Sequence, residues 1–218
     1  NLPNAPSDFH GFVIRQQPDG EFLFGPTLRG QTIIKMTLDG RVVLTIPASV
    51  IPDEYKIRNA RSGQLGVLLT SMDVAPNGDL YVTDGYASDY VHRFDRNGKY
   101  LTSFGGKKEP YSFNTLQKIA IDSRFQPARI IATDRANNRV IHLSLDGQFL
   151  GVVARDLLLP AAVTIDGDNA VIGELTGRVT NLGNRTFAET SSYNAQQGER
   201  FRPGAPRQFY LGAQYRFN

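Results

Sequence analysis

Histidine is the side chain best suited to metal binding and to proton transfer near neutral pH, and this chain has three: His10, His92 and His142. His92 and His142 each stand within an apolar run, which predicts packing inside a sheet. A catalytic zinc site needs about three protein ligands, and the chain has no Cys to add to His10. Zinc-protease, nucleophile-elbow and phosphate-loop motifs are also missing from the sequence. We therefore predict no metal, no cofactor and no catalytic residue.

The elements that would position a binding site are strands. Alternating runs at residues 80–83, 90–94 and 99–104 predict three antiparallel strands. Asn97-Gly98 between the last two predicts a two-residue turn, because both residues tolerate the positive φ of a primed turn. Similar runs with Asp-Gly turns recur at residues 9–46, 119–150 and 162–180. The repetition predicts an all-β chain, a partial or small β-propeller of about four antiparallel blades with a C-terminal strand extension.

The sequence divides into two parts. Residues 1–183 hold the predicted blades, and residues 184–218 form a tail of different character. Residues 47–66 mix prolines and charges, and we interpret them as an insertion loop with at most one helical turn.

One repeat carries a family resemblance. The stretch V-A-P-N-G-D-L-Y-V-T-D-G (residues 74–85), followed by V-H-R-F-D-R-N-G-K-Y-L-T-S-F-G (residues 91–105), resembles an NHL-type β-propeller repeat. Residues 83–86 are similar to the variant in peptidyl-α-hydroxyglycine α-amidating lyases. The resemblance covers about residues 9–182. Such propellers usually have six blades, so about four blades imply a truncated, miniature or fused ring.

The resemblance also implies where a site would lie. In the lyase family, metal-binding histidines open the inner strands of several blades. The matching positions here are His10, Thr70, Gln117 and Ala161, so one histidine of such a set is present. We expect any ligand to bind at the channel mouth, through His10, Thr70, Gln117, Lys118 and Arg135.

Acidic residues recur at fixed places in the blades. In NHL-like repeats an acid and an arginine commonly lock the inner strands, which implies the structural pairs Asp134 with Arg139 and Glu174 with Arg178. Three further acids, Asp73, Asp122 and Asp166, stand near inner-strand ends. They could suggest calcium, but each lies in a different blade, and we interpret them as turn formers.

Charge and hydropathy exclude some partners. The net charge of +3 resides in the tail, which holds Arg185, Arg200, Arg202, Arg207 and Arg216 against Glu189 and Glu199. Arginines spread this thinly, without stacking aromatics on a defined surface, do not predict nucleic-acid binding. No apolar run approaches the ~20 residues of a transmembrane helix. The chain begins without Met, which weakly favours export to the periplasm or outer membrane.

The tail carries a second resemblance. V-T-N-L-G-N-R-T-F-A-E-T and R-P-G-A-P-R-Q-F-Y-L-G-A-Q-Y-R-F, within residues 179–217, are similar to the last strands of TonB-dependent outer-membrane receptors. Residues 207–217 alternate apolar and polar side chains, as barrel strands do. Two strands cannot close a barrel, so we expect no membrane insertion by this chain alone. We expect this strand to dock on the propeller or to mediate self-association.

Three functions stay open. The first is a non-enzymatic propeller module that binds a protein or a small molecule. The second is a divergent metal-dependent lyase or hydrolase that uses His10. The third is a remnant of a TonB-dependent receptor. Metal analysis distinguishes the first two, and detergent dependence identifies the third.

Overall fold

The computed structural model describes residues 6, 8–60 and 62–175, and the backbone of short strands at residues 179–181, 193–194 and 198–199. Within this part of the chain the regular structure is β apart from three 3-10 turns, η1 (Ala48–Val50), η2 (Asp53–Tyr55) and η3 (Arg135–Asn137). None of its helical segments is long and apolar enough to cross a membrane. The tail strand expected at residues 207–217 lies outside the described residues, as does its docking.

Four antiparallel sheets follow one another along the chain, and within each sheet neighbouring strands are consecutive in sequence. The first sheet comprises β1 (Val13–Gln17), β2 (Gly20–Pro26), β3 (Thr32–Thr37) and β4 (Val42–Pro47). The second comprises β7 (Ser71–Val74), β8 (Leu80–Thr83), β9 (Tyr90–Phe94) and β10 (Tyr100–Gly105). The third comprises β11 (Leu116–Asp122), β12 (Arg129–Asp134), β13 (Arg139–Ser144) and β14 (Phe149–Ala154). The fourth comprises β15 (Pro160–Asp166), β16 (Asn169–Glu174) and β17 (Val179–Asn181).

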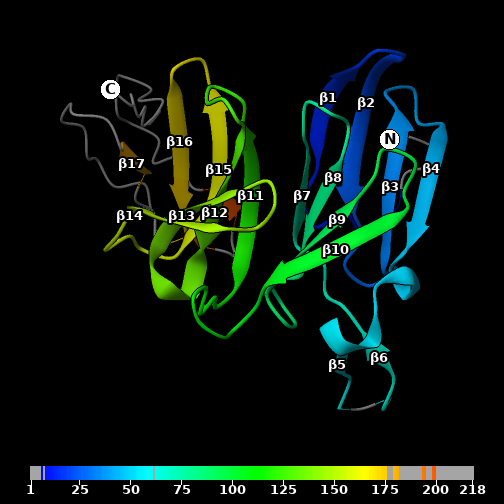
Figure 1. The fold of residues 1–218 in the computed structure, drawn as a ribbon, viewed down its shortest axis with the longest axis horizontal. Coiled ribbons are helices and arrows are strands. Elements are labelled where there is room, and N and C mark those ends of the chain that lie inside the picture. The colour runs from blue at the N-terminus through cyan, green and yellow to red at the C-terminus, as the bar shows by residue number, and fades with distance from the viewer. Residues whose placement is uncertain are drawn as a thin grey trace.

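The sheets are the blades of a partial β-propeller, which confirms the predicted fold class. Figure 1 shows the first two blades on the right and the last two on the left. The first strands of successive blades lie side by side, with β7 next to β11 and β11 next to β15. A further two-residue hairpin, β18 (Tyr193–Asn194) with β19 (Gly198–Glu199), belongs to the tail.

The hairpin between β9 and β10 uses a different turn from the predicted one. The Gly98 N–H donates to the Asp95 carbonyl at 3.0 Å, and the Asp95 N–H donates to the Lys99 carbonyl at 2.9 Å. Gly98 has φ +86°, whereas Asn97 is not among the residues with positive φ. Both primed turn types need positive φ at the first of the two central residues, and Asn97 lacks it, so that prediction was wrong. The Asp95 carboxylate accepts the N–H groups of Asn97 and Lys99, both at 2.9 Å, which stabilises the wider turn.

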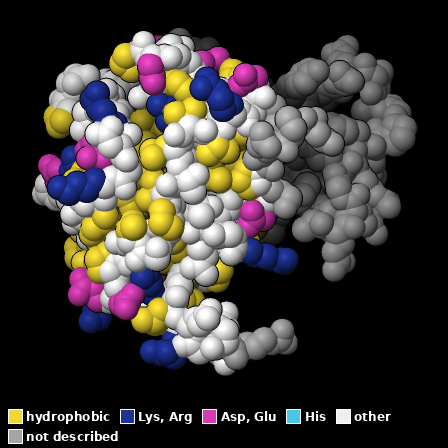
Figure 2. Space-filling model, turned by 90° about the vertical axis from the view of Figure 1, so that its right-hand side faces the viewer, with side chains coloured by type: hydrophobic (Ala, Val, Ile, Leu, Met, Phe, Trp, Pro, Cys, Tyr) yellow, Lys and Arg dark blue, Asp and Glu magenta, His cyan; other side chains and the backbone are white. Residues whose placement is uncertain are grey.

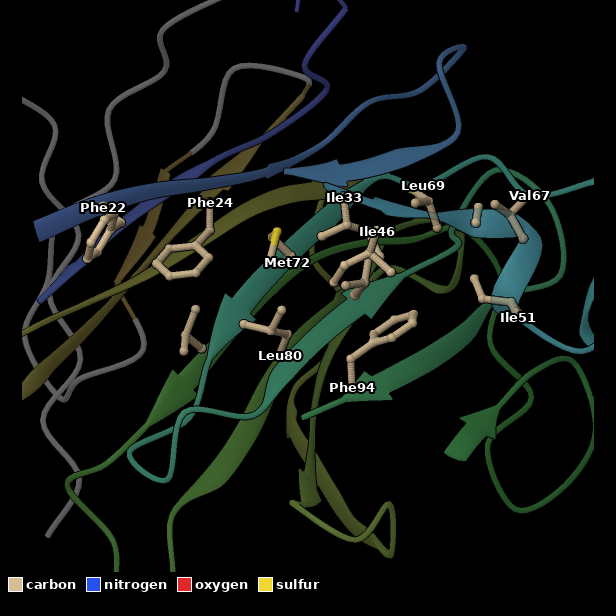
Figure 3. Packing of buried hydrophobic residues seen from close by; sticks show 13 residues of the cluster. Phe22, Phe24, Ile33, Ile46, Ile51, Val67, Leu69, Met72, Leu80 and Phe94 are labelled. Carbon is tan, nitrogen blue, oxygen red and sulfur yellow. The ribbon is translucent and has the colours of Figure 1, made fainter. Parts of the chain in front are cut away.

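Each pair of neighbouring blades encloses its own apolar layer. Between the first two blades, Phe24 and Ile33 from one sheet meet Met72, Leu80 and Phe94 from the other, and Figure 3 shows them facing one another. A second layer joins blades two and three, and a third joins blades three and four. Face-to-face packing of twisted sheets thus holds the blades in order and fixes where their strand ends lie.

The insertion between blades one and two is more ordered than a loop. It holds η1, η2 and a short hairpin of β5 (Ile57–Arg58) with β6 (Leu65–Gly66). Ile51 is 1% exposed and packs into the first apolar layer. The Tyr55 and Tyr90 rings meet edge to face at 4.9 Å between centroids. The 3-10 turns of the insertion therefore pack against the blades, whereas its β5–β6 hairpin is mostly exposed and projects from them (Figure 1).

The outer strand of blade one is apolar on its exposed side. β4 lies at the right of Figure 1, and Figure 2 shows apolar side chains between charged ones on that side of the molecule. Val42 and Val43 are 40% and 47% exposed. An edge strand of this kind offers unpaired backbone groups next to apolar side chains.

Candidate ligand site at one end of the blades

Four polar side chains from three blades meet at one end of the sheets. His10 precedes β1, Tyr86 follows β8, Gln117 lies in β11, and Arg135 opens η3 after β12. The first two strands of a blade are antiparallel, so the second strand ends beside the residue where the first begins. In blade three, for example, Asp134 at the end of β12 pairs with Leu116 at the start of β11. Packing of the blades then brings these ends together. We call this group of His10, Tyr86, Gln117 and Arg135 the His10 cluster.

Hydrogen bonds connect the members of the cluster. His10 Nδ1 lies 2.8 Å from the Thr70 carbonyl oxygen, and His10 Nε2 lies 3.1 Å from the Tyr86 hydroxyl. A carbonyl only accepts, so Nδ1 carries a proton, and in the neutral imidazole Nε2 is then the acceptor for the Tyr86 hydroxyl. Arg135 Nη1 donates to the Tyr86 oxygen at 3.4 Å and to Gln117 Oε1 at 3.0 Å. Tyr86 is thus held between a base and a cation.

Ring contacts reinforce the placement of Tyr86. The His10 and Tyr86 rings meet at 89° with centroids 4.9 Å apart. The Arg135 guanidinium carbon lies 5.4 Å from the centroid of the same ring, within the range of cation–π attraction. Tyr86 is therefore held by residues from two other blades.

The partners of Arg135 differ from those of other blade arginines. Arg15, Arg93 and Arg139 each contact a carboxylate oxygen, at 2.7, 2.7 and 2.6 Å. Arg135 is oriented by an amide and a hydroxyl, and among the described residues no carboxylate pairs with it. Its positive charge is therefore not neutralised by these neighbours. Its partners occupy Nη1 and leave Nε and Nη2, the pair of donors that fits a carboxylate.

Thr70, expected to bind ligand, is buried and supports the cluster from behind. Its hydroxyl lies 2.9 Å from the Thr83 hydroxyl and donates to the Leu116 carbonyl at 2.9 Å. Its own carbonyl accepts from His10. Thr70 thus ties blades two and three together and sets the tautomer of His10.

A glycine allows the close approach that places Tyr86. A Cβ on Gly85 would lie 2.0 Å from the Leu116 carbonyl oxygen, far inside contact distance. The chain therefore passes this point only without a side chain. Tyr86 itself was missed as a site residue by the sequence reasoning, although residues 83–86 carry part of the family resemblance.

Lys118, the fifth expected site residue, is partly buried in β11 next to Gln117. Burial lowers the pKa of its ammonium, the Asp73 charge raises it, and the Arg15 charge lowers it. Lys118 therefore lies near the point where Arg15 of β1 reaches Asp73 of β7.

The recurring acids anchor the segments that enter their blades. The Leu68 N–H donates to Asp84 Oδ1 at 2.7 Å, and the Asn114 N–H donates to Asp134 Oδ1 at 2.8 Å. Burial raises the pKa of Asp84 to about 6, against the opposing effect of its hydrogen bonds. In blades two and three, these hydrogen bonds hold the segment that precedes the first strand against the end of the second strand.

The acid–arginine pairs were expected from the resemblance at two places. Asp134 and Arg139 form an ion pair at 2.6 Å across the β12–β13 turn, and Arg139 also donates to the Tyr111 carbonyl at 2.6 Å. Glu174 accepts the N–H of Leu158. Arg178 lies outside the described residues, so its pairing with Glu174 stays a prediction.

The other two histidines lie on third strands. His92 on β9 is fully buried, its Nδ1 lies 2.7 Å from the Ser103 hydroxyl, and burial lowers its pKa to about 3. His142 on β13 lies 3.0 Å from Arg129 Nη1. Neither belongs to the His10 cluster. Among the described residues, no three His, Cys, Asp or Glu side chains gather as a metal-binding group.

No protein-family model matches the sequence. Selenomethionine-substituted virginiamycin B lyase from Staphylococcus aureus is similar in structure, with a TM-score of 0.54 at 15% identity, over 82% of this chain and 53% of that chain. BBS1N, in its complex with ARL6DN, is similar with a TM-score of 0.56 at 12% identity, over 94% of this chain and 62% of that chain. The chain thus spans less than two thirds of either structure. At such identities the likeness shows a propeller-like fold alone.

Proposed function

We propose that this chain is a β-propeller binding module that holds the carboxylate of a small molecule or of a protein partner at the His10 cluster. The observation that supports this most directly is Arg135, which neutral groups orient and no described carboxylate neutralises. We further propose that its repeats are of the NHL type, on the pattern of residues 74–85 and 91–105. The receptor-like resemblance of residues 179–217 falls mostly outside the described residues and stays a proposal.

In this proposal the side chains have separate tasks. Arg135 binds the carboxylate through Nε and Nη2, because two parallel charge-assisted bonds match the two oxygens. Gln117 and Tyr86 fix the guanidinium plane, which reduces the entropy lost on binding. His10 Nε2 accepts the hydroxyl proton of Tyr86. The lone pairs of the Tyr86 oxygen then remain available to Arg135 Nη1.

Titration of benzoate into the purified protein, followed by NMR, tests the proposal. Arg135→Gln should weaken binding about 10- to 100-fold, because a hydrogen bond to a charged group contributes about 1.5–3 kcal/mol. Arg155→Gln is the matched control, since Arg155 is exposed and lies outside the cluster. Equal affinities for the wild type and Arg135→Gln would refute the proposal, and so would an equal loss in the control.

One observation favours a second candidate, the metal-dependent lyase or hydrolase. The Tyr86 hydroxyl lies 3.1 Å from His10 Nε2, a geometry in which a neutral His10 can take a proton from Tyr86. About one equivalent of zinc in the purified protein, lost in His10→Ala, would favour this candidate over the binding module.

A further inference from the structure

The three residues that lead into β1 lie along the end of β2 and carry His10 at their last position. Backbone hydrogen bonds of 3.1 and 3.3 Å join residues 8–10 to residues 26–28. Between these bonds, Phe9 and Thr27 form an antiparallel bridge. We call residues 8–10 the strap. The strap is thus a short extra strand held on blade one.

Two side chains fasten the strap to blade one. Asp8 Oδ2 accepts the backbone N–H groups of Arg29 at 2.9 Å and Gly30 at 2.8 Å, both in the β2–β3 turn. The ring of Phe9 lies over Gly25 in β2, so closely that a Cβ on this glycine would lie 2.7 Å from Phe9 Cδ1. A charged acceptor and an aromatic ring therefore fix the two residues directly before His10.

The ring of His10 then crosses to blade two. Its Nδ1 lies 2.8 Å from the Thr70 carbonyl oxygen, and its Nε2 lies 3.1 Å from the Tyr86 hydroxyl. The same hydroxyl oxygen accepts from Arg135 of blade three. His10 is the member of the cluster that blade one supplies, so the strap determines where its imidazole meets Tyr86.

We propose that Asp8 is a positioning residue for the His10 cluster, because its hold on the β2–β3 turn keeps His10 against Tyr86 and thereby keeps Arg135 in its binding orientation. This rests on the proposed function, since it concerns the same site. The sign of the effect is diagnostic. Coulomb attraction alone predicts that losing the negative charge of Asp8 strengthens anion binding at Arg135, whereas positioning predicts that it weakens binding.

Benzoate titrations of matched variants test the sign. Asp8→Ala should weaken binding about 2- to 10-fold, the equivalent of about one hydrogen bond. Asp8→Asn keeps an oxygen acceptor and should restore most of the affinity. Asp19→Ala is the control, because it removes the same charge from a side chain that is 64% exposed, and it should not weaken binding. In a His10→Ala background, Asp8→Ala should have almost no further effect, because Asp8 acts through His10.

The imidazole proton signals of His10 in the free protein give a second readout, which needs no ligand. They should move in Asp8→Ala and stay in place in Asp19→Ala. Gly25→Ala is an independent variant, because its methyl group would displace the Phe9 ring, and it should move the same signals.

The outcomes separate this proposal from the proposed function. Tighter benzoate binding in Asp8→Ala, or a weakening that is undiminished in the His10→Ala background, would refute Asp8 as a positioning residue. Signals of His10 that move in neither Asp8→Ala nor Gly25→Ala would refute it as well. If the wild type does not bind benzoate, the carboxylate module fails, and the His10 signals alone decide whether the strap positions the imidazole.

Discussion

Asp73→Asn is expected to be the most damaging single-atom change in the blades. The carboxylate accepts four hydrogen bonds, from Arg15, Val74 and the Ile121 amide of the next blade. An asparagine oxygen can keep about two of them, and its NH₂ group turns donors toward the remaining N–H groups. Arg15 loses its counterion, and a buried amide loses its acceptor.

The expected cost is about 3–5 kcal/mol of unfolding free energy, the range for removing one partner of a buried ion pair. Arg15 is 40% exposed, which places the expectation toward the lower end. For a chain of this length about 2–4 °C of melting temperature corresponds to 1 kcal/mol. The melting temperature should therefore fall by roughly 6–20 °C.

Thermal unfolding followed by circular dichroism at pH 7 measures this shift. Asp19→Asn is the control, since Asp19 is 64% exposed and lies 3.5 Å from Lys35, so its loss should cost about 0–1 kcal/mol. In the Asp73→Asn background, Arg15→Met should cost little more, because the pair is already broken. If Asp73→Asn lowers the melting temperature no more than Asp19→Asn does, Asp73 does not bridge three blades as described.

The remaining predictions concern Gly85 and two buried titrating groups. Gly85→Ala should displace Tyr86 and weaken benzoate binding, because its Cβ would meet a carbonyl oxygen at 2.0 Å; unchanged binding and stability would contradict this. The pKa of Asp84 is raised to about 6, so its contribution to unfolding free energy falls as pH rises from about 4 to 6. The pKa of His92 is lowered to about 3, so its contribution is lost as pH falls below about 6.5, by about 2 kcal/mol at pH 5. We expect the free energy of unfolding to fall more steeply from pH 7 to pH 4 in Asp84→Asn than in the wild type, and less steeply in His92→Gln. The opposite order would refute the assigned direction of both pKa shifts.

Much of the fold was predictable because it is local. A hairpin pairs residues that are close in sequence, and alternation with turn residues marks its strands. The repeats therefore located the blades, although the geometry of the turn at Asn97-Gly98 depended on Asp95, whose carboxylate accepts two N–H groups within the loop. The insertion at residues 47–66 was placed correctly but not its packing, since nothing local shows that Ile51 joins the core between two blades.

The sequence by itself determined the blade repeats and most of the residues that gather at one end of the sheets. Only tertiary structure decided what those residues do there. His10 meets Tyr86 across 76 positions of sequence, and Arg135 meets Tyr86 across 49. Asp73, interpreted as a turn former, is instead a buried bridge to Arg15 across 58 positions. The physical reason is that the pairing of a charged side chain depends on residues that are distant in sequence. Contacts between blades decide whether a cation has a carboxylate partner or can bind a ligand, and no local sequence pattern shows these contacts.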